Sequence, residues 1–123
     1  TGNYQAVVCS LEAMDIQIGR LRKAVEKAGG MLLLSADHGN SDDMFEHDKK
    51  TGSVSRKADG SPKAKTSHSL NPVPCVLYDP ESKGEYAREL KAGLGISSLS
   101  ATCIELLGFE APEGYDPSVL AMR

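Results

Sequence analysis

A short apolar run that ends abruptly in polar and flexible residues constrains this fold more than any other feature. Residues 31–36 (MLLLSA) lie between Gly29-Gly30 and Asp37-His38-Gly39-Asn40, which leaves too little room for a typical helix. An apolar run without polar alternation predicts a β-strand covered on both faces, as in a parallel sheet with helices on either side. Ligands bind beyond the carboxyl ends of such strands, so residues 37–40 form the first candidate site.

A long amphipathic helix is predicted before this strand, over residues 3–28. Its apolar side chains follow one another at alternating spacings of four and three and form one stripe: Val7, Leu11, Met14, Ile18, Leu21, Val25 and Ala28. Asn3 can cap the start, and Gly29-Gly30 can end the helix by accepting a left-handed residue. A coiled coil is the alternative, but the stripe lasts only about three heptads without orderly flanking charges, so we expect packing on a sheet.

A polar excursion and a second strand follow the candidate site. Residues 46–65 are rich in turn formers and predict an exposed excursion, such as a hairpin. The excursion carries six lysines and arginines against three acids. The second strand is expected at residues 73–78, and Pro72 and Pro74 confine its start to a sheet edge or the beginning of a strand, because proline donates no ladder hydrogen bond.

The last third of the chain is predicted to surround one short helix with turns. Residues 85–90 can form a helical turn, and Ser98 or Ser100 can cap a helix that Gly108 ends. The tail beyond it is expected to wrap back on the surface. The predicted order of elements is helix, strand, long loop, strand and helix, which indicates the α/β class. A chain of 123 residues suffices for one domain, or a large piece of one, with a real core.

Composition excludes several classes of protein. The net charge of −3 provides no general basic surface for nucleic acid. No apolar run approaches the roughly 20 residues that span a bilayer, and no basic-then-apolar signal pattern opens the chain. Cys9, Cys75 and Cys103 are odd in number and widely spaced, which predicts reduced, buried residues in a cytoplasmic protein.

Asp37 and His38 are the first candidate metal ligands. Neighbours on a strand point to opposite faces, but the backbone can turn at a strand end, and Gly39 permits conformations closed to other residues. Both side chains can then face one cation, and carboxylate oxygen with imidazole nitrogen suits manganese or zinc. The alternative is a turn-capping aspartate beside a hydrogen-bonded loop histidine.

His68 is the third candidate ligand. It precedes the second strand, so it can lie at the same sheet edge, and the hydroxyls of Thr66, Ser67 and Ser69 could orient its ring through the second nitrogen. The alternative is an ordinary surface-loop histidine. His47 lies in the excursion, and we expect it to be exposed to solvent.

Three segments carry a family resemblance: SADHGNSDDMF, KTSHSLNPVPCVLYD and ISSLSATCIELLGFEAPEGYDPSVL. They resemble the C-terminal end of the cofactor-independent phosphoglycerate mutases, in the alkaline phosphatase superfamily, and the similarity extends to Thr1-Gly2-Asn3 and the long helix. The resemblance implies part of an alkaline-phosphatase-like layered sheet with flanking helices. It also implies a cytoplasmic enzyme of glycolysis and gluconeogenesis that interconverts 3-phosphoglycerate and 2-phosphoglycerate through a phosphoserine. Such an enzyme uses two metal ions, usually manganese, and needs no 2,3-bisphosphoglycerate.

The resemblance also implies specific roles. Asp37 and His38 match the residues that bind the metal holding the serine nucleophile, and His68 matches a ligand of the second metal. The serine, the substrate-binding arginines and an Asp-x-x-x-His ligand pair are expected upstream of Thr1. Residues 1–123 are thus expected to be a C-terminal segment, inactive without the remaining N-terminal part of the enzyme.

Some alternatives stay open. The gap between the two ligand motifs is longer than is typical of the family, with the excess in the excursion; a flexible loop lengthens at a cost of only about 0.6 kcal/mol per doubling. The excursion is either a plain surface insertion or a device in which Lys63 and Lys65 attract the anionic substrate. Another superfamily enzyme, such as a phosphopentomutase or phosphodiesterase, and a non-catalytic metal-binding module are the competing readings. An Asp-x-x-x-His directly upstream would favour the mutase.

Overall fold

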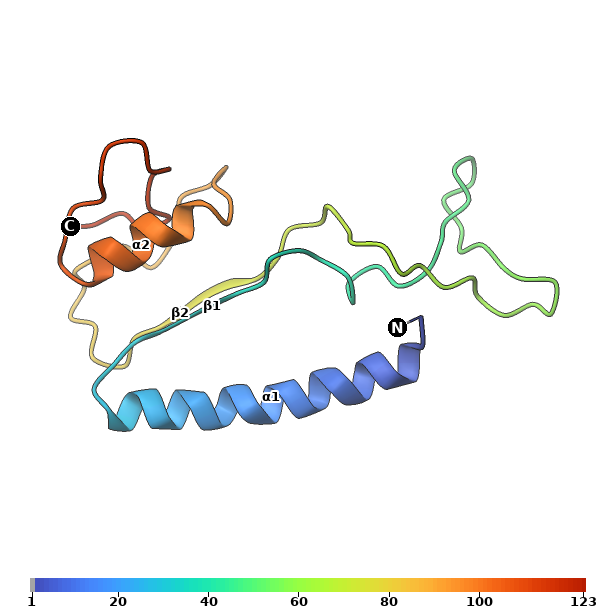
Figure 1. Ribbon diagram of the computed structural model, residues 1–123, viewed down its shortest axis with the longest axis horizontal. Helices are drawn as coiled ribbons and strands as arrows, with labels where there is room; N and C mark the ends of the chain where they lie inside the picture. The colour runs from blue at the N-terminus through green and yellow to red at the C-terminus, as the bar shows by residue number, and fades with distance from the viewer. Residues whose placement is uncertain (1) are drawn as a thin grey trace. The chain divides into compact units, whose positions relative to one another are not determined.

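The protein consists of two compact units, Thr1–Tyr78 and Asp79–Arg123. The structure is a computed structural model that describes residues 2–123, so Thr1, where the family resemblance begins, lies outside it. The first unit contains α1 (Tyr4–Lys27), β1 (Leu32–Ser35) and β2 (Cys75–Tyr78), and the second contains α2 (Ser98–Leu106) (Figure 1). Within the described residues, no helix combines the length and apolar character that crossing a bilayer requires.

Helix α1 begins and ends where the sequence predicts. The Asn3 side chain caps its start by accepting a hydrogen bond from the Ala6 amide at 3.0 Å. At the other end Gly29 adopts a left-handed φ of 64°, and the Gly30 amide donates to the Val25 carbonyl at 3.0 Å. This closing pattern satisfies the last carbonyls and turns the chain into β1.

Strands β1 and β2 pair antiparallel, from Leu32 opposite Tyr78 to Ser35 opposite Cys75. The expectation of a parallel sheet covered on both faces is therefore wrong for this pair, and all four residues of β1 are only half-buried. A parallel pair needs a crossover connection, usually helical, and the described segment between β1 and β2 contains no helix. Strand β2 starts at Cys75, directly after Pro74 and two residues later than the predicted start at residue 73, because proline donates no ladder hydrogen bond.

Helix α1 runs alongside the strands and the base of the excursion (Figure 1). The Arg22 guanidinium lies over the Tyr78 ring at 5.5 Å, and the Tyr4 ring stacks on Phe45 with centroids 5.9 Å apart. The predicted packing on a sheet is only partial, because Met14 and Leu21 in the stripe are 51% and 53% exposed. A sheet of two strands offers too little apolar area to cover the stripe.

The excursion is exposed, as expected, but it forms two hairpins on a shared stem instead of one (Figure 1). In the stem, the Glu46 amide donates to the Lys63 carbonyl at 2.9 Å. Three isolated antiparallel bridges mark the stem, the first hairpin and the second hairpin in turn: Phe45–Ala64, His47–Val54 and Arg56–Pro62.

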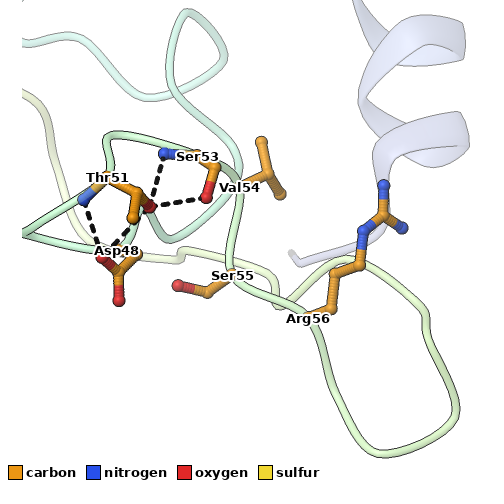
Figure 2. A pocket seen from close by; sticks show the side chains of 6 residues that line it. All are labelled: Asp48, Thr51, Ser53, Val54, Ser55 and Arg56. Atoms are coloured by element: carbon orange, nitrogen blue, oxygen red, sulfur yellow. Dashed lines mark hydrogen bonds between the residues drawn. The ribbon is translucent and has the colours of Figure 1, made fainter.

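A shallow pocket lies along the first hairpin and is lined by Asp48, Thr51, Ser53, Val54, Ser55 and Arg56 (Figure 2). Asp48 accepts hydrogen bonds from the amides of Lys50 and Thr51, both at 2.9 Å, and from the Thr51 hydroxyl at 3.1 Å. These bonds, the Thr51 amide first, lower the pKa of Asp48. The acid of this pocket is therefore occupied in closing its own turn.

The second unit departs from the sequence predictions in two places. Ser97, not Ser98 or Ser100, is the N-cap of α2, and its side chain makes no capping hydrogen bond. Residues 85–90 are not helical, because they pair with the tail: Tyr86 bridges Met122, and the Ala87 amide donates to the Ala121 carbonyl at 2.8 Å. Gly108, with a φ of 83°, lies just beyond the end of α2 as predicted.

The buried apolar core is small, so the expectation of a real core is wrong for this chain. Four apolar residues are buried among those described: Met44, Ala101, Val119 and Leu120. Three of them belong to the second unit, where residues 118–120 of the tail are buried against α2. The buried Thr102 hydroxyl joins the two, because it accepts from the Val119 amide at 3.0 Å and donates to the Ser98 carbonyl at 2.7 Å. Residues 112–117 of the tail are exposed, as expected for a segment that lies on the surface.

The three cysteines are unpaired, as predicted for a reduced protein. Cys75 is half-buried, but Cys9 and Cys103 are exposed, so the prediction that all three are buried is wrong.

Thr102→Val should release the tail from α2. The substitution keeps the shape but leaves the buried Val119 amide without an acceptor, which costs about 1–3 kcal/mol. We expect hydrogen exchange at the Val119 amide to accelerate about 5- to 150-fold. Thr102→Ser keeps the hydroxyl and is the control; equal exchange rates in the two variants would contradict the role of this hydrogen bond.

Candidate metal centre

The candidate site forms where β1 ends and the chain returns toward β2. Because the two strands are antiparallel, the segment after β1 and the segment before β2 lie at the same edge of the sheet. Gly39 and Ser69 pair there in an isolated bridge, in which the Ser69 amide donates to the Gly39 carbonyl at 2.9 Å. The prediction that His68 shares the edge of Asp37 and His38 is confirmed.

Gly39 is required by close packing and not by an unusual backbone conformation. Its φ is not positive, so the expectation that it adopts a conformation closed to other residues is wrong. A Cβ at this position would lie 2.1 Å from the Ser69 hydroxyl oxygen and 2.6 Å from Asp42 Oδ1. Only glycine lets the two segments approach this closely.

The two site histidines lie face to face. The ring centroids of His38 and His68 are 3.5 Å apart, with 10° between the ring planes. Residues 30 positions apart in the sequence are thus in direct contact.

The ring of His38 is oriented for metal binding. Its Nδ1 lies 3.1 Å from the Gly39 carbonyl oxygen, which only accepts hydrogen bonds, so Nδ1 is the donor. In the neutral ring Nε2 then keeps its lone pair and faces Asp37 Oδ1 at 3.7 Å. A cation with bonds of about 2.0–2.2 Å reaches both atoms, because 3.7 Å is shorter than two such bonds. The donor atoms of Asp37 and His38 therefore fit a borderline metal ion.

His68 is held differently from the way its sequence suggests. Across residues 2–123, none of the hydroxyls of Thr66, Ser67 and Ser69 hydrogen-bonds its ring, so that expectation is wrong. The Ser69 hydroxyl instead donates to Asp42 Oδ2 at 2.7 Å. The exposed His68 ring stacks on His38, and its neighbour Ser69 is held by the Gly39 carbonyl and Asp42.

Asp42 and Asn71 are site residues that sequence reasoning missed. The Asn71 side-chain amide donates to Asp42 Oδ2 at 2.6 Å, the oxygen that also accepts from Ser69. Ser69 first and Asn71 second hold the pKa of Asp42 below its usual value. In the sequence, the indication that could have been used was the pair of polar residues on either side of Leu70, Ser69 and Asn71, directly after His68.

The beginning of the described chain also lies near His68. A Cβ on Gly2 would be 2.9 Å from the Ala64 methyl and 3.4 Å from Thr66 Cγ2. Gly2 therefore packs against the segment that leads into His68, and a larger side chain at this position would collide with Ala64.

The lysines next to the site are neutralised by acids of the stem. Lys63 pairs with Glu46 at 2.6 Å, and Lys65 pairs with Asp43. These ion pairs tie both lysines to nearby acids, and the hypothesis that Lys63 and Lys65 attract an anionic substrate stays a prediction. His47 is exposed as predicted, and its Nδ1 lies 3.7 Å from Asp43.

The ligand set is incomplete within the described part of the chain. There, no three or more His, Cys, Asp or Glu side chains gather around a position that could hold a metal ion. Catalytic metal sites usually have three protein ligands, so further ligands are needed around Asp37, His38 and His68.

Comparison with known proteins identifies the family. The model of the metalloenzyme superfamily matches residues 1–111, and the chain belongs to this family. The chain is 46% identical over 120 residues to a probable 2,3-bisphosphoglycerate-independent phosphoglycerate mutase of Leptospira interrogans, and 43% identical over 124 residues to the enzyme of that name from Trypanosoma brucei brucei. Each match covers 98% of this chain and 22% of the relative.

A solved structure supports the same relationship. The chain resembles a Leishmania mexicana phosphoglycerate mutase determined at low cobalt concentration, with a TM-score of 0.89 and 38% identity over 99% of this chain. It spans 22% of that structure, about the same share as of the curated relatives. The alkaline-phosphatase-like α/β class and the resemblance to the phosphoglycerate mutases are both confirmed.

Gly39→Ala should separate the two histidine segments, because the new methyl group collides with Ser69 and Asp42. We expect loss of the nuclear Overhauser contact between the His38 and His68 rings. Gly19→Ala, in the middle of α1 with nothing within 4 Å, is the matched control and should leave that contact intact. Retention of the ring contact in Gly39→Ala would contradict the packing role of Gly39.

The contact between the segment after β1 and the segment before β2 should also weaken in acid. The pKa of Asp42 is lower in the folded state than in the unfolded state. Its contribution to the stability of the fold is therefore complete above the unfolded pKa of about 3.9 and is lost as the pH falls through the folded pKa. The Ser69 hydroxyl is the largest cause of the lowered pKa, so Ser69→Ala should raise the pKa of Asp42 toward its usual value. A carboxyl carbon-13 titration from pH 6 to pH 2 measures this; an unchanged midpoint would refute the assignment.

Proposed function

We propose that this chain is the C-terminal part of a 2,3-bisphosphoglycerate-independent phosphoglycerate mutase, and that it provides ligands for two divalent metal ions, manganese in particular. The carrying observation is the convergence of Asp37 Oδ1 and His38 Nε2 at 3.7 Å, with the His68 ring stacked beside them. The relatives bear this enzyme name, and the family is a family of metalloenzymes, which supports the proposal.

In this proposal each residue has a defined task. Asp37 and His38 hold one cation, and the Gly39 carbonyl keeps the His38 ring in the tautomer that leaves Nε2 free. His68 holds the second cation. When bound, the two ions neutralise charge on the transferred phosphoryl group and favour the ionised nucleophile. The reaction interconverts 3-phosphoglycerate and 2-phosphoglycerate through a phosphoserine, as a step of glycolysis and gluconeogenesis in the cytoplasm.

The preceding part of the enzyme supplies the remaining groups. The nucleophilic serine, the substrate-binding residues and the other metal ligands come from it, and residues 1–123 form a C-terminal segment of the phosphatase-like domain. The exposed apolar stripe of α1, with Leu11, Met14 and Leu21 each at least 40% exposed, is a surface that this part would cover. The chain alone, with two ligands for one ion and one for the other, is inactive.

The test uses the longer mutase that contains this chain. Asp37→Asn and His38→Ala should each lower turnover of 3-phosphoglycerate by more than about 100-fold, beyond the range typical of outer-shell changes. Circular dichroism should be unchanged, and bound manganese should fall. His47→Ala removes an exposed histidine of the excursion and should keep turnover within about twofold of the parent. Near-normal turnover of Asp37→Asn with normal circular dichroism would refute the metal role.

A further inference from the structure

We propose that Asp42 is a positioning residue that holds His68 against His38 and thereby sets the place of the second metal ion relative to the first. The inference rests on the proposed function for the identity of the two ions. Asp42 is not itself proposed as a ligand; it acts through Ser69 and Asn71.

Asp42 closes a small ring of hydrogen bonds around the residue that follows His68. Its Oδ2 accepts from the Ser69 hydroxyl at 2.7 Å and from the Asn71 side-chain amide at 2.6 Å. The Asn71 backbone amide in turn donates to the Ser69 hydroxyl oxygen at 3.4 Å. Ser69 is only 7% exposed, so its hydroxyl has little water to replace a lost partner.

The residue before His68 is tied to the same segment. The Asn40 side-chain amide donates to the Ser67 carbonyl at 3.4 Å, and the Ser69 amide donates to the Gly39 carbonyl at 2.9 Å. His68 is thus flanked on both sides by bonds to residues 39–42. Of these bonds, those to Asp42 alone involve a carboxylate, and charge-assisted bonds are the stronger kind.

Asp42 differs from Asp59, another acid that accepts such hydrogen bonds, in how far away its partners lie in the sequence. Asp59 in the second hairpin also accepts a serine hydroxyl and a backbone amide, at 2.6 and 2.8 Å, but both belong to Ser61, two residues away. Asp42 instead joins residues 27 and 29 positions away. An acid that only closed a turn would have no need of such distant partners.

This geometry predicts an asymmetric effect. Asp37 and His38 follow the end of β1 after one residue, so we expect their backbone to persist when Asp42 is lost, whereas the segment carrying His68 loses its hydrogen bonds to Asp42. Binding of the second ion should therefore weaken, and binding of the first should remain. Loss of a group that hydrogen-bonds a metal ligand typically lowers metal affinity by about 10- to 100-fold. Asp42 acts one step further out, through Ser69, so we expect the low end of that range, about 10-fold, for the second ion in Asp42→Ala.

The experiment compares Asp42→Ala, Asp42→Asn and Asp59→Ala in the longer mutase by titration with manganese alone. We expect two bound ions in the parent and in Asp59→Ala, and one strong plus one weakened ion in Asp42→Ala. Excess manganese should restore the kcat of Asp42→Ala, because only the position of a ligand is lost, whereas His68→Ala should not recover. Asp42→Asn keeps an amide oxygen as acceptor and should be intermediate.

A second measurement keeps the inference independent of metal binding. In the longer mutase without metal and with labelled histidines, the nuclear Overhauser contact between the His38 and His68 rings should weaken in Asp42→Ala and persist in Asp59→Ala. Two equally tight manganese ions in Asp42→Ala, or an unchanged ring contact, would overturn the inference. If Asp37→Asn leaves manganese binding intact, the proposed function fails; if Asp37→Asn abolishes it while Asp42→Ala matches the parent, only the role of Asp42 fails.

Discussion

The carbonyl oxygen of Gly39 is the point on which the candidate site depends. It lies 3.1 Å from His38 Nδ1 and accepts the Ser69 amide at 2.9 Å, so one atom orients the first histidine and anchors the segment of the second. This double contact needs a residue without a side chain, since any Cβ would meet the Ser69 hydroxyl at 2.1 Å. A backbone group thus organises a site whose chemistry belongs to the side chains around it.

Local features of the fold could be predicted from the sequence, and long-range ones could not. The limits of α1 follow from Asn3 and Gly29, and the start of β2 follows from Pro74, because each acts on its own neighbours. The ligand candidates were found in the same way, from residue types at the ends of strands. The antiparallel pairing and the hydrogen bonds of Asp42 to Ser69 and Asn71 join residues on either side of the whole excursion, so the local sequence does not show which partners meet. Residues 85–90 were mispredicted for the same reason, since their partners lie in the tail.

The excursion has a structural role beside the candidate site. Its two lysines nearest to His68, Lys63 and Lys65, each pair with an acid. Its stem packs against the beginning of the described chain, through Phe45 on Tyr4 and Ala64 beside Gly2. This packing places the start of α1 near the segment of His68, where our proposal needs the preceding ligands to arrive.

The central claim is that Asp37 and His38 hold one metal ion and His68 holds another. Anomalous diffraction at the manganese edge, from crystals of the longer mutase grown with manganese, tests it most directly. We predict two peaks, one within coordination distance of both Asp37 and His38 and a second within coordination distance of His68. Peaks that touch none of the three residues, or a single ion shared by both histidines, would contradict the claim.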